Sequence, residues 1–303
     1  MSVLVVGSVA LDSVETPFGK VAEALGGSGT YFSTSASFFT AVKLVAVVGK
    51  DFPSEHLSFL RERKVDLDGL QVVEGETFRW EGRYEYDLNE AHTLDTRLNV
   101  FESFHPDLPE HYRDAEFVFL GNIDPELQLE VLDQVKSPRL VACDTMNFWI
   151  EGKREALVKT LGHVDMLVIN EAEVRQLAEE PNLVKAAQTI SAMGPKTLVI
   201  KRGEYGVLMF SEGKVFSIPA YPLESVYDPT GAGDTFAGGL IGYLAHSGKT
   251  DNETLRQAIV FGSVMASFNV EKFSLDRLRS LDFVEVCERY NQFRELTTFQ
   301  SLA

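Results

Sequence analysis

Short apolar runs rich in β-branched residues recur along the chain and alternate with longer stretches of helical periodicity. The apolar runs are residues 3–7, 44–48, 117–120, 140–143, 166–169, 197–200 and 206–210. The helical stretches include residues 126–135, 153–161, 171–179, 183–193, 252–270 and 275–293. A short continuous apolar run is typical of a strand buried on both faces, and strands that alternate with helices form parallel sheets covered on both sides. The sequence therefore predicts an α/β fold with a doubly wound, mostly parallel sheet.

Two regions depart from this alternation. Apolar and polar residues alternate from about residue 70 to residue 104, as in Thr77-Phe-Arg-Trp-Glu-Gly-Arg-Tyr-Glu-Tyr, and residues 12–23 offer one more strand. Alternation with aromatic residues is typical of antiparallel strands that have one wet face. We predict a small β-sheet from residues 12–23 and 70–104 that projects, as a lid, from a single domain of residues 1–303. A surface hairpin without a functional role is the alternative.

Composition disfavours several classes of protein. The formal net charge of −17 argues against nucleic acid or an anionic membrane surface as a partner. No window approaches the roughly 20 apolar residues that span a bilayer, and the first residues lack the basic segment of a signal peptide. Cys143 and Cys287 have no metal-type spacing and suit a reducing compartment. We therefore expect a cytoplasmic protein with small-molecule ligands, no nucleic acid and no membrane partner.

The most informative stretch begins at Val226 and reads Val-Tyr-Asp-Pro-Thr-Gly-Ala-Gly-Asp-Thr-Phe-Ala-Gly-Gly. Turn-forming residues run here into an apolar helix pattern, which predicts Gly231, Ala232 and Gly233 at a helix N-terminus. Free backbone N–H groups and the positive end of the helix dipole bind anions at such a place. Asp234, just inside the helix, can accept a proton from a hydroxyl group. An anion site beside a base suits phosphoryl transfer; the alternative is an ordinary helix after a glycine-rich turn.

The segment Asp228-Pro-Thr-Gly-Ala-Gly-Asp-Thr-Phe-Ala-Gly-Gly resembles the C-terminal signature of the PfkB/ribokinase family of carbohydrate and nucleoside kinases. The Gly26-Gly-Ser-Gly turn, Val48-Gly-Lys-Asp and Asn170-Glu-Ala-Glu fall in the family's order and spacing, so the resemblance covers essentially the whole chain. It implies a ribokinase-like core with a β-sheet lid and ATP-dependent phosphorylation of a small sugar, polyol or nucleoside. Asp234 then matches the catalytic base, and the amides of Gly231–Gly233 match the anion hole.

Two other functions are alternatives to this one. A non-catalytic ligand-binding or regulatory protein can share the fold, because fold does not fix function. A dinucleotide oxidoreductase fits less well, because the first predicted strand lacks the Gly-x-Gly-x-x-Gly turn.

The resemblance also places residues beside the acceptor. Asp12 falls where the family holds sugar hydroxyls, and a carboxylate accepts such hydrogen bonds well. Gly26, Gly27 and Ser28 resemble the N-terminal di-glycine signature, which lets backbone approach a polyol ring.

Two further polar residues, Asp144 and Asn147, follow the predicted strand 140–143 at the edge where open α/β sheets bind ligands. Tyr31 and Phe32 stand where many members carry an asparagine, which favours an acceptor with a flat or apolar portion. Nucleosides and inositol-like polyols both stay open as acceptors.

The nucleotide side is implied by two motifs. Asn170 and Glu173 match the family's Asn-x-x-Glu, which positions Mg²⁺ and phosphate largely through water, with Glu173 as the metal contact. The same spacing is also that of a helix capping box. Lys201, Gly203 and Gly206 resemble the strand and turn beside the nucleotide, with Lys201 offering a point charge to a phosphate.

Three expectations complete the prediction. Ser263 lies in a stretch that resembles the helix beside the adenine. Some family members hold a monovalent cation near the backbone of Asp228–Thr230, so Thr230 is grouped with the cofactor-binding residues and such a cation stays open here. The projecting sheet can pair with a second copy of the chain, which would give a homodimer through the lid.

Overall fold

The computed structural model describes residues 1–300, which form two β-sheets. The larger sheet has the strand order β13-β12-β11-β10-β9-β8-β1-β4-β5. In that order its strands span Lys214–Ile218, Val207–Ser211, Thr197–Lys201, Met166–Asn170, Leu140–Cys143, Phe117–Leu120, Ser2–Val6, Ala41–Gly49 and Val65–Val73. Every pair is parallel except the two that include β12. The predicted doubly wound, mostly parallel sheet is confirmed, with the strand predicted at 206–210 as its antiparallel member.

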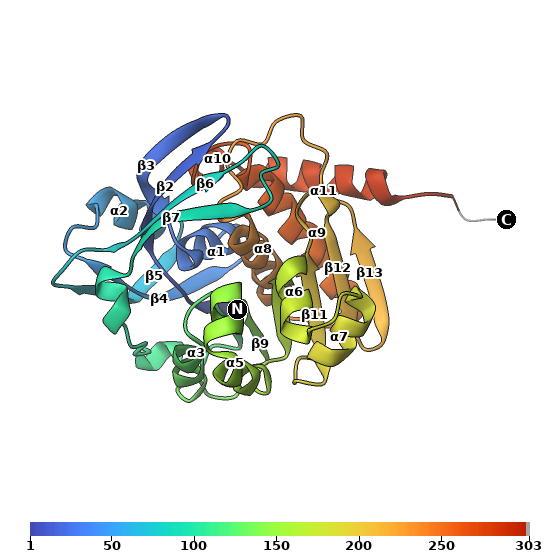
Figure 1. The fold of residues 1–303 in the computed structure, drawn as a ribbon, viewed down its shortest axis with the longest axis horizontal. Helices are drawn as coiled ribbons and strands as arrows, with labels where there is room; N and C mark the ends of the chain where they lie inside the picture. Colours follow the sequence, from blue (N-terminus) through green and yellow to red (C-terminus); the bar gives the residue numbers. More distant parts are fainter. Residues whose placement is uncertain (301–303) are drawn as a thin grey trace.

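Helices cover both faces of this sheet (Figure 1). One face carries α1 (Ser28–Ala36), α2 (Ser54–Glu62), α8 (Ala232–Ser247), α9 (Asn252–Asn269), α10 (Asp276–Ser280) and α11 (Phe283–Thr297). The other face carries α3 (Pro125–Leu132), α4 (Asn147–Gly152), α5 (Arg154–Leu161), α6 (Glu171–Ala178) and α7 (Leu183–Ser191). Successive side chains of a strand point to opposite faces, so Val3 and Val5 of β1 join the first core while Leu4 and Val6 join the second.

The predicted helix at 275–293 is divided into α10 and α11. Asp282 accepts a hydrogen bond from the backbone N–H of Glu285 at 2.9 Å, and Glu285 bonds back to the backbone of Asp282. This capping box satisfies backbone donors that would otherwise lack partners, so a new helix starts here.

The smaller sheet is the lid, and its strands follow the order β3-β2-β6-β7. They span Gly19–Gly26, Ala10–Thr16, Phe78–Tyr84 and Ala91–Arg97. The lid differs from the prediction at two boundaries. Residues 12–23 belong to a hairpin of two strands, because a turn at residues 17–18 reverses the chain. Leu70 pairs with Ala46 in β4 of the large sheet, so β5 ends the core and the lid resumes only at Phe78.

The lid lies over the carboxyl ends of the parallel strands (Figure 1). Short 3₁₀ helices at Asn99–Ser103, Glu110–Tyr112 and Gly203–Tyr205 complete the described elements. Among residues 1–300, no helix is both long enough and apolar enough to cross a membrane.

Candidate active site

The first turn of α8 carries the predicted base. Gly231 is the N-cap and has a φ of 70°, and Asp234 lies in the first turn of the helix. No side chain caps this helix, so its first N–H groups are free to bind an anion. A Cβ on Gly231 would lie 2.4 Å from ring carbons of Tyr31. The left-handed backbone and the Tyr31 ring together restrict this position to glycine.

The turn before α8 is fixed by buried hydrogen bonds. Asp228 accepts from the backbone N–H of Thr230 and of Ser274, both at 2.9 Å. The Thr230 carbonyl accepts from Asn269 Nδ2 at 2.9 Å. The Thr230 hydroxyl lies 3.3 Å from the hydroxyl of Tyr84 in the lid. The turn that precedes the anion site is therefore bound both to the end of α9 and to the lid.

Asp234 has an unusual charge environment. Burial and the nearby carboxylate of Asp144 raise the pKa of Asp234 to about 7, although Lys201 opposes the rise. Lys201 donates to Asp144 Oδ2 at 2.8 Å, and a Cβ on Gly233 would lie 3.0 Å from Lys201 Nζ. The ammonium group therefore lies beside the free N–H groups of α8, where it adds to their attraction for an anion.

The motif Asn170-x-x-Glu173 forms a capping box at the start of α6. Asn170 Oδ1 accepts from the backbone of Glu173 at 2.8 Å, and Glu173 Oε2 accepts from the backbone of Asn170 at 3.1 Å. Burial and Asp144 raise the pKa of Glu173 to about 7, again against the effect of Lys201. The capping box, which was the alternative interpretation of this motif, is therefore present. It leaves the second carboxylate oxygen of Glu173 without a hydrogen bond in the described part of the chain.

These groups leave a deficit of positive charge. The carboxylate of Asp144 raises the pKa of both Glu173 and Asp234, and Lys201 lowers the pKa of both. Mg²⁺ binds carboxylates through few direct contacts and keeps several waters. The donor set and its excess of negative charge therefore fit a hydrated divalent cation.

Asp12 is the acidic group on the lid side. It is 6% exposed, and burial together with Asp228 and Asp234 raises its pKa to about 7 although the Gly27 backbone lowers it. A Cβ on Gly26 would lie 1.9 Å from Asp12 Oδ2. Gly26 therefore admits the carboxylate against the backbone, and the structure brings Asp12 into the same charge cluster as Asp234.

Several predicted residues have other surroundings. Ser28 Oγ accepts from the backbone of Ser8 at 3.1 Å, so it holds the end of β1 to the start of α1. Asn147 is exposed at the start of α4. Phe32 is fully buried and stacks on Phe119 with ring centroids 4.3 Å apart, so the expectation that Phe32 offers a flat surface to the acceptor is wrong.

The predicted nucleotide turn lies under the tip of the lid. A Cβ on Gly203 would lie 2.7 Å from Asn89 Oδ1, in the β6–β7 loop. Arg202 donates to Glu171 at 2.7 Å, and buried Gly206 closes the turn before β12. The tip of the lid therefore lies against this turn.

Four buried hydroxyl groups have no hydrogen-bond partner in residues 1–300. They belong to Thr30 and Ser33 on α1, to Thr145, which follows Asp144, and to Ser263 on α9. An unsatisfied buried hydroxyl is costly unless a ligand or water pairs with it. Ser263 stays a candidate for the adenine side, and Thr145 is a residue that the sequence prediction missed.

Sequence reasoning also missed Trp80 and Tyr84 of β6. Their only signal was the aromatic alternation in this strand, which did not reveal which face turns inward. The contact between Tyr84 and Thr230 shows that this face turns toward the site.

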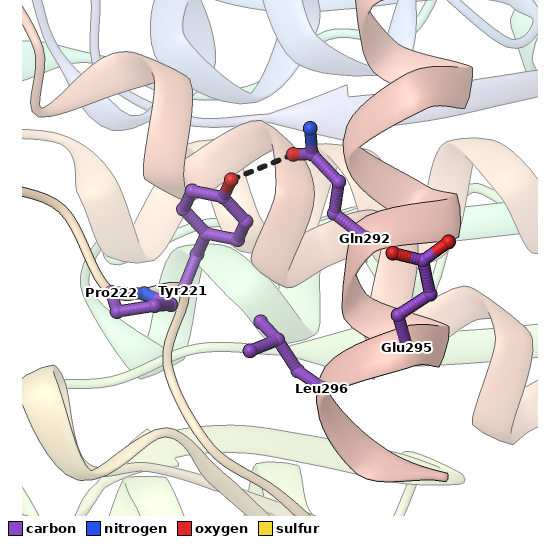
Figure 2. A pocket seen from close by; sticks show the side chains of 5 residues that line it. All are labelled: Tyr221, Pro222, Gln292, Glu295 and Leu296. Carbon is purple, nitrogen blue, oxygen red and sulfur yellow. Dashed lines mark hydrogen bonds between the residues drawn. The ribbon is translucent and has the colours of Figure 1, made fainter.

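Figure 2 shows a separate hollow between the segment at Tyr221 and Pro222 and helix α11, from which Gln292, Glu295 and Leu296 line it. Tyr221 donates to Gln292 Oε1 at 2.6 Å. Glu295 is its one carboxylate, and none of the predicted site residues lines it. We therefore place the chemistry at α8.

Comparison with known proteins identifies the family of the chain. The family model described as pfkB family carbohydrate kinase matches residues 2–279. A cytidine kinase from Thermococcus kodakarensis is 32% identical over 249 residues, which cover 80% of this chain and 88% of that protein. The nucleoside kinase of Methanocaldococcus jannaschii superposes with a TM-score of 0.77 at 20% identity, over 96% of this chain and 98% of that one. A putative ribokinase II from E. coli, solved with ATP and Mg²⁺, gives 0.78 at 18% identity, over 96% and 99%. The chain therefore belongs to the pfkB family of carbohydrate kinases, phosphotransferases that act on hydroxyl groups.

Proposed function

We propose that this kinase transfers the γ-phosphoryl group of ATP to a hydroxyl of a small sugar, polyol or nucleoside, with Asp234 as the general base. The observation that carries the assignment is the position of Asp234 in the first turn of α8, beside the uncapped N–H groups that follow Gly231. A base and an anion site within one helical turn suit in-line phosphoryl transfer.

In this proposal the acceptor hydroxyl lies between Asp234 and the γ-phosphorus. The carboxylate takes the hydroxyl proton as the oxygen bonds to phosphorus, and the bond from phosphorus to the bridging oxygen of ADP breaks. The N–H groups of Gly231, Ala232 and Gly233 donate to the transferred group, and Lys201 adds positive charge beside them. Asp12 holds other hydroxyl groups of the acceptor.

The nucleotide would lie along the edge formed by α6, the turn after β11 and the start of α8. We assign its contacts to Asn170, Lys201, Gly203, Gly206 and Ser263, and place Mg²⁺ near Glu173 and Asp144. When bound, Mg²⁺ neutralises charge that develops on the phosphates.

A monovalent cation near Asp228 and Thr230 is a separate part of the proposal. Asp228 is fully buried, and burial raises its pKa, a cost that a nearby cation would offset. Replacing potassium by tetramethylammonium at equal ionic strength tests this part, because loss of activity would support the cation and unchanged activity would contradict it.

Two further expectations from the sequence also stay proposals. The cytoplasm, which is reducing, suits the free cysteines Cys143 and Cys287. A homodimer through the lid would use the exposed strand β7, whose residues are all exposed.

The experiment that tests the proposed function is a coupled assay of ADP release with a panel of acceptors. Cytidine leads the panel because of the relative from Thermococcus kodakarensis, and adenosine, ribose, fructose and myo-inositol follow. Mass spectrometry of the products should show one added phosphoryl group per turnover. If ADP release with every acceptor stayed at the rate without acceptor, the assignment to these classes would be wrong.

A further inference from the structure

We propose that Trp80 in the lid is the surface against which a nucleoside acceptor packs its base, so the acceptor class is the nucleosides. This inference rests on the proposed kinase function and narrows it. Three features of Trp80 support it: its register in the lid, the contacts that hold the indole ring, and its position outside both hydrophobic cores of residues 1–300.

The register places Trp80 beside Asp12 on the inner face of the lid. Asp12 in β2 pairs directly with Trp80 in β6, and paired residues on neighbouring strands share a face about 5 Å apart. Tyr84, four residues further along β6, shares that face and reaches Thr230. Trp80 therefore faces the same space as the carboxylate that holds the acceptor's hydroxyl groups.

The indole ring is held in place by the lid itself. A Cβ on Gly82 would lie 2.1 Å from a carbon of the Trp80 ring, so the ring lies over the glycine. Trp80 Nε1 donates to Thr93 Oγ1 of β7 at 3.2 Å. One surface of the ring and its polar edge are therefore fixed before any ligand binds, which lowers the entropic cost of stacking.

Packing in the two hydrophobic cores of residues 1–300 does not account for the rest of the indole ring. Trp80 is partly exposed, and it belongs to neither hydrophobic core of the described residues. No aromatic ring or cation stacks on it within residues 1–300, whereas Trp149 contacts Phe148. A rigid, partly exposed indole beside a hydroxyl-binding carboxylate fits a flat heterocycle attached to a sugar.

A sugar or polyol alone would make little use of this surface. With its ribose hydroxyls on Asp12, a nucleoside would place its base along the lid, toward the indole. Stacking of a base on an aromatic ring tolerates any base, because every base has a π-face. Trp80 thus predicts selection for nucleosides over acceptors without a base, and it does not choose among the bases.

The first test measures binding without turnover. Trp149→Phe leaves Trp80 as the single tryptophan, since the chain has two. Cytidine and adenosine should change its fluorescence saturably, while ribose and myo-inositol should not. If neither nucleoside changes the emission although the same protein phosphorylates nucleosides, the inference fails and the kinase function stands. If no acceptor is phosphorylated, the kinase function itself fails.

The second test compares Trp80→Leu with Trp80→Phe, each checked for its melting temperature. Leucine removes the flat ring, so kcat/KM for cytidine should fall by about 5- to 100-fold, mostly through KM. Phenylalanine keeps a flat ring and should retain most of the value. Equal losses in both variants, or an unchanged KM for cytidine in Trp80→Leu, would overturn the assignment.

Discussion

Lys201, at the end of β11, donates a hydrogen bond to Asp144, which directly follows β9, and the two strands flank β10 at the carboxyl edge of the sheet. The lysine side chain is 19% exposed and the aspartate side chain 5%. Burial alone would lower the pKa of Lys201, but Asp144 and Glu173 outweigh it and raise that pKa. The lysine therefore stays charged and lowers the ionisation cost of Glu173 and Asp234.

Replacing Lys201 with methionine should raise the pKa of Asp234, because the cation that opposes burial and Asp144 is lost. The acid limb of kcat/KM should move to higher pH, and turnover at pH 7 should fall by about 100-fold or more as the phosphoryl group loses a nearby charge. Lys136→Met is the matched control, because Lys136 pairs with Glu110 on the surface. An unchanged acid limb would show that Lys201 acts only as a structural ion pair.

Gly231 should tolerate no side chain. Gly231 and Gly213 have nearly equal positive φ values, 70° and 72°, but a Cβ on Gly213 would meet nothing within 4 Å. Gly213→Ala therefore carries only backbone strain, on the order of 1–2 kcal/mol. Gly231→Ala adds the clash with Tyr31, so it should lower the melting temperature more than Gly213→Ala does. It should also lower kcat, because Gly231 begins the proposed anion site. Equal melting temperatures for the two variants would contradict the contact with Tyr31.

Asp12→Asn should weaken acceptor binding and leave ATP binding nearly unchanged. Hydrogen bonds to a charged group contribute about 1.5–3 kcal/mol, which corresponds to a rise of roughly 10- to 100-fold in the KM for the acceptor. Glu15→Gln is the control, because Glu15 is exposed on the same strand. Steady-state kinetics with each substrate varied in turn give the two KM values. A rise of the same size in the KM for ATP would contradict the assignment of Asp12 to the acceptor.

The stability of the protein should depend on pH through Asp234. Its pKa rises from the ordinary 3.8 to about 7 on folding, so the folded state binds more protons than the unfolded state between those values. Stability from this group is then fully present below pH 3.8, falls as the pH rises, and levels off above about pH 7.

Asp234→Asn removes this dependence. The variant should melt above the wild type at pH 8, since a gain of ~1 kcal/mol corresponds to about 1.5 °C for 303 residues at about 2.1 cal/mol/K per residue. The difference should be smaller at pH 5. Thermal unfolding at the two pH values measures this difference in melting temperature. A difference that grew toward acid pH would contradict a raised pKa for Asp234.

The parallel sheet and the start of α8 followed from local sequence. The strands at 117–120 and 140–143 have the predicted bounds, because a strand buried on both faces is apolar at each position. The glycine-rich start of α8 could also be predicted from local sequence, because the N-cap and the acidic residue of the first turn lie within four residues.

The acceptor side was less predictable, because it depends on contacts between distant residues. The pairing of Asp12 with Trp80 joins residues 68 positions apart, and the pairs on either side of it, β2–β3 and β6–β7, each contain a register shift. The alternation of apolar and polar residues does not show which face of the lid turns toward the site until that register is known. The expectation of an acceptor with a flat or apolar portion rested on Tyr31 and Phe32, and the structure buries both of these rings.

The most direct test of the account is the turnover of Asp234→Asn with an acceptor that the wild type phosphorylates. We predict that kcat falls by about 10²- to 10⁴-fold, as expected for loss of a general base, while the Kd of ATP stays within a few fold. Asp133→Asn, at an exposed position after α3, should behave as the wild type. Near-normal turnover by Asp234→Asn, in a protein that is folded and binds ATP, would contradict the assignment of Asp234 as the catalytic base.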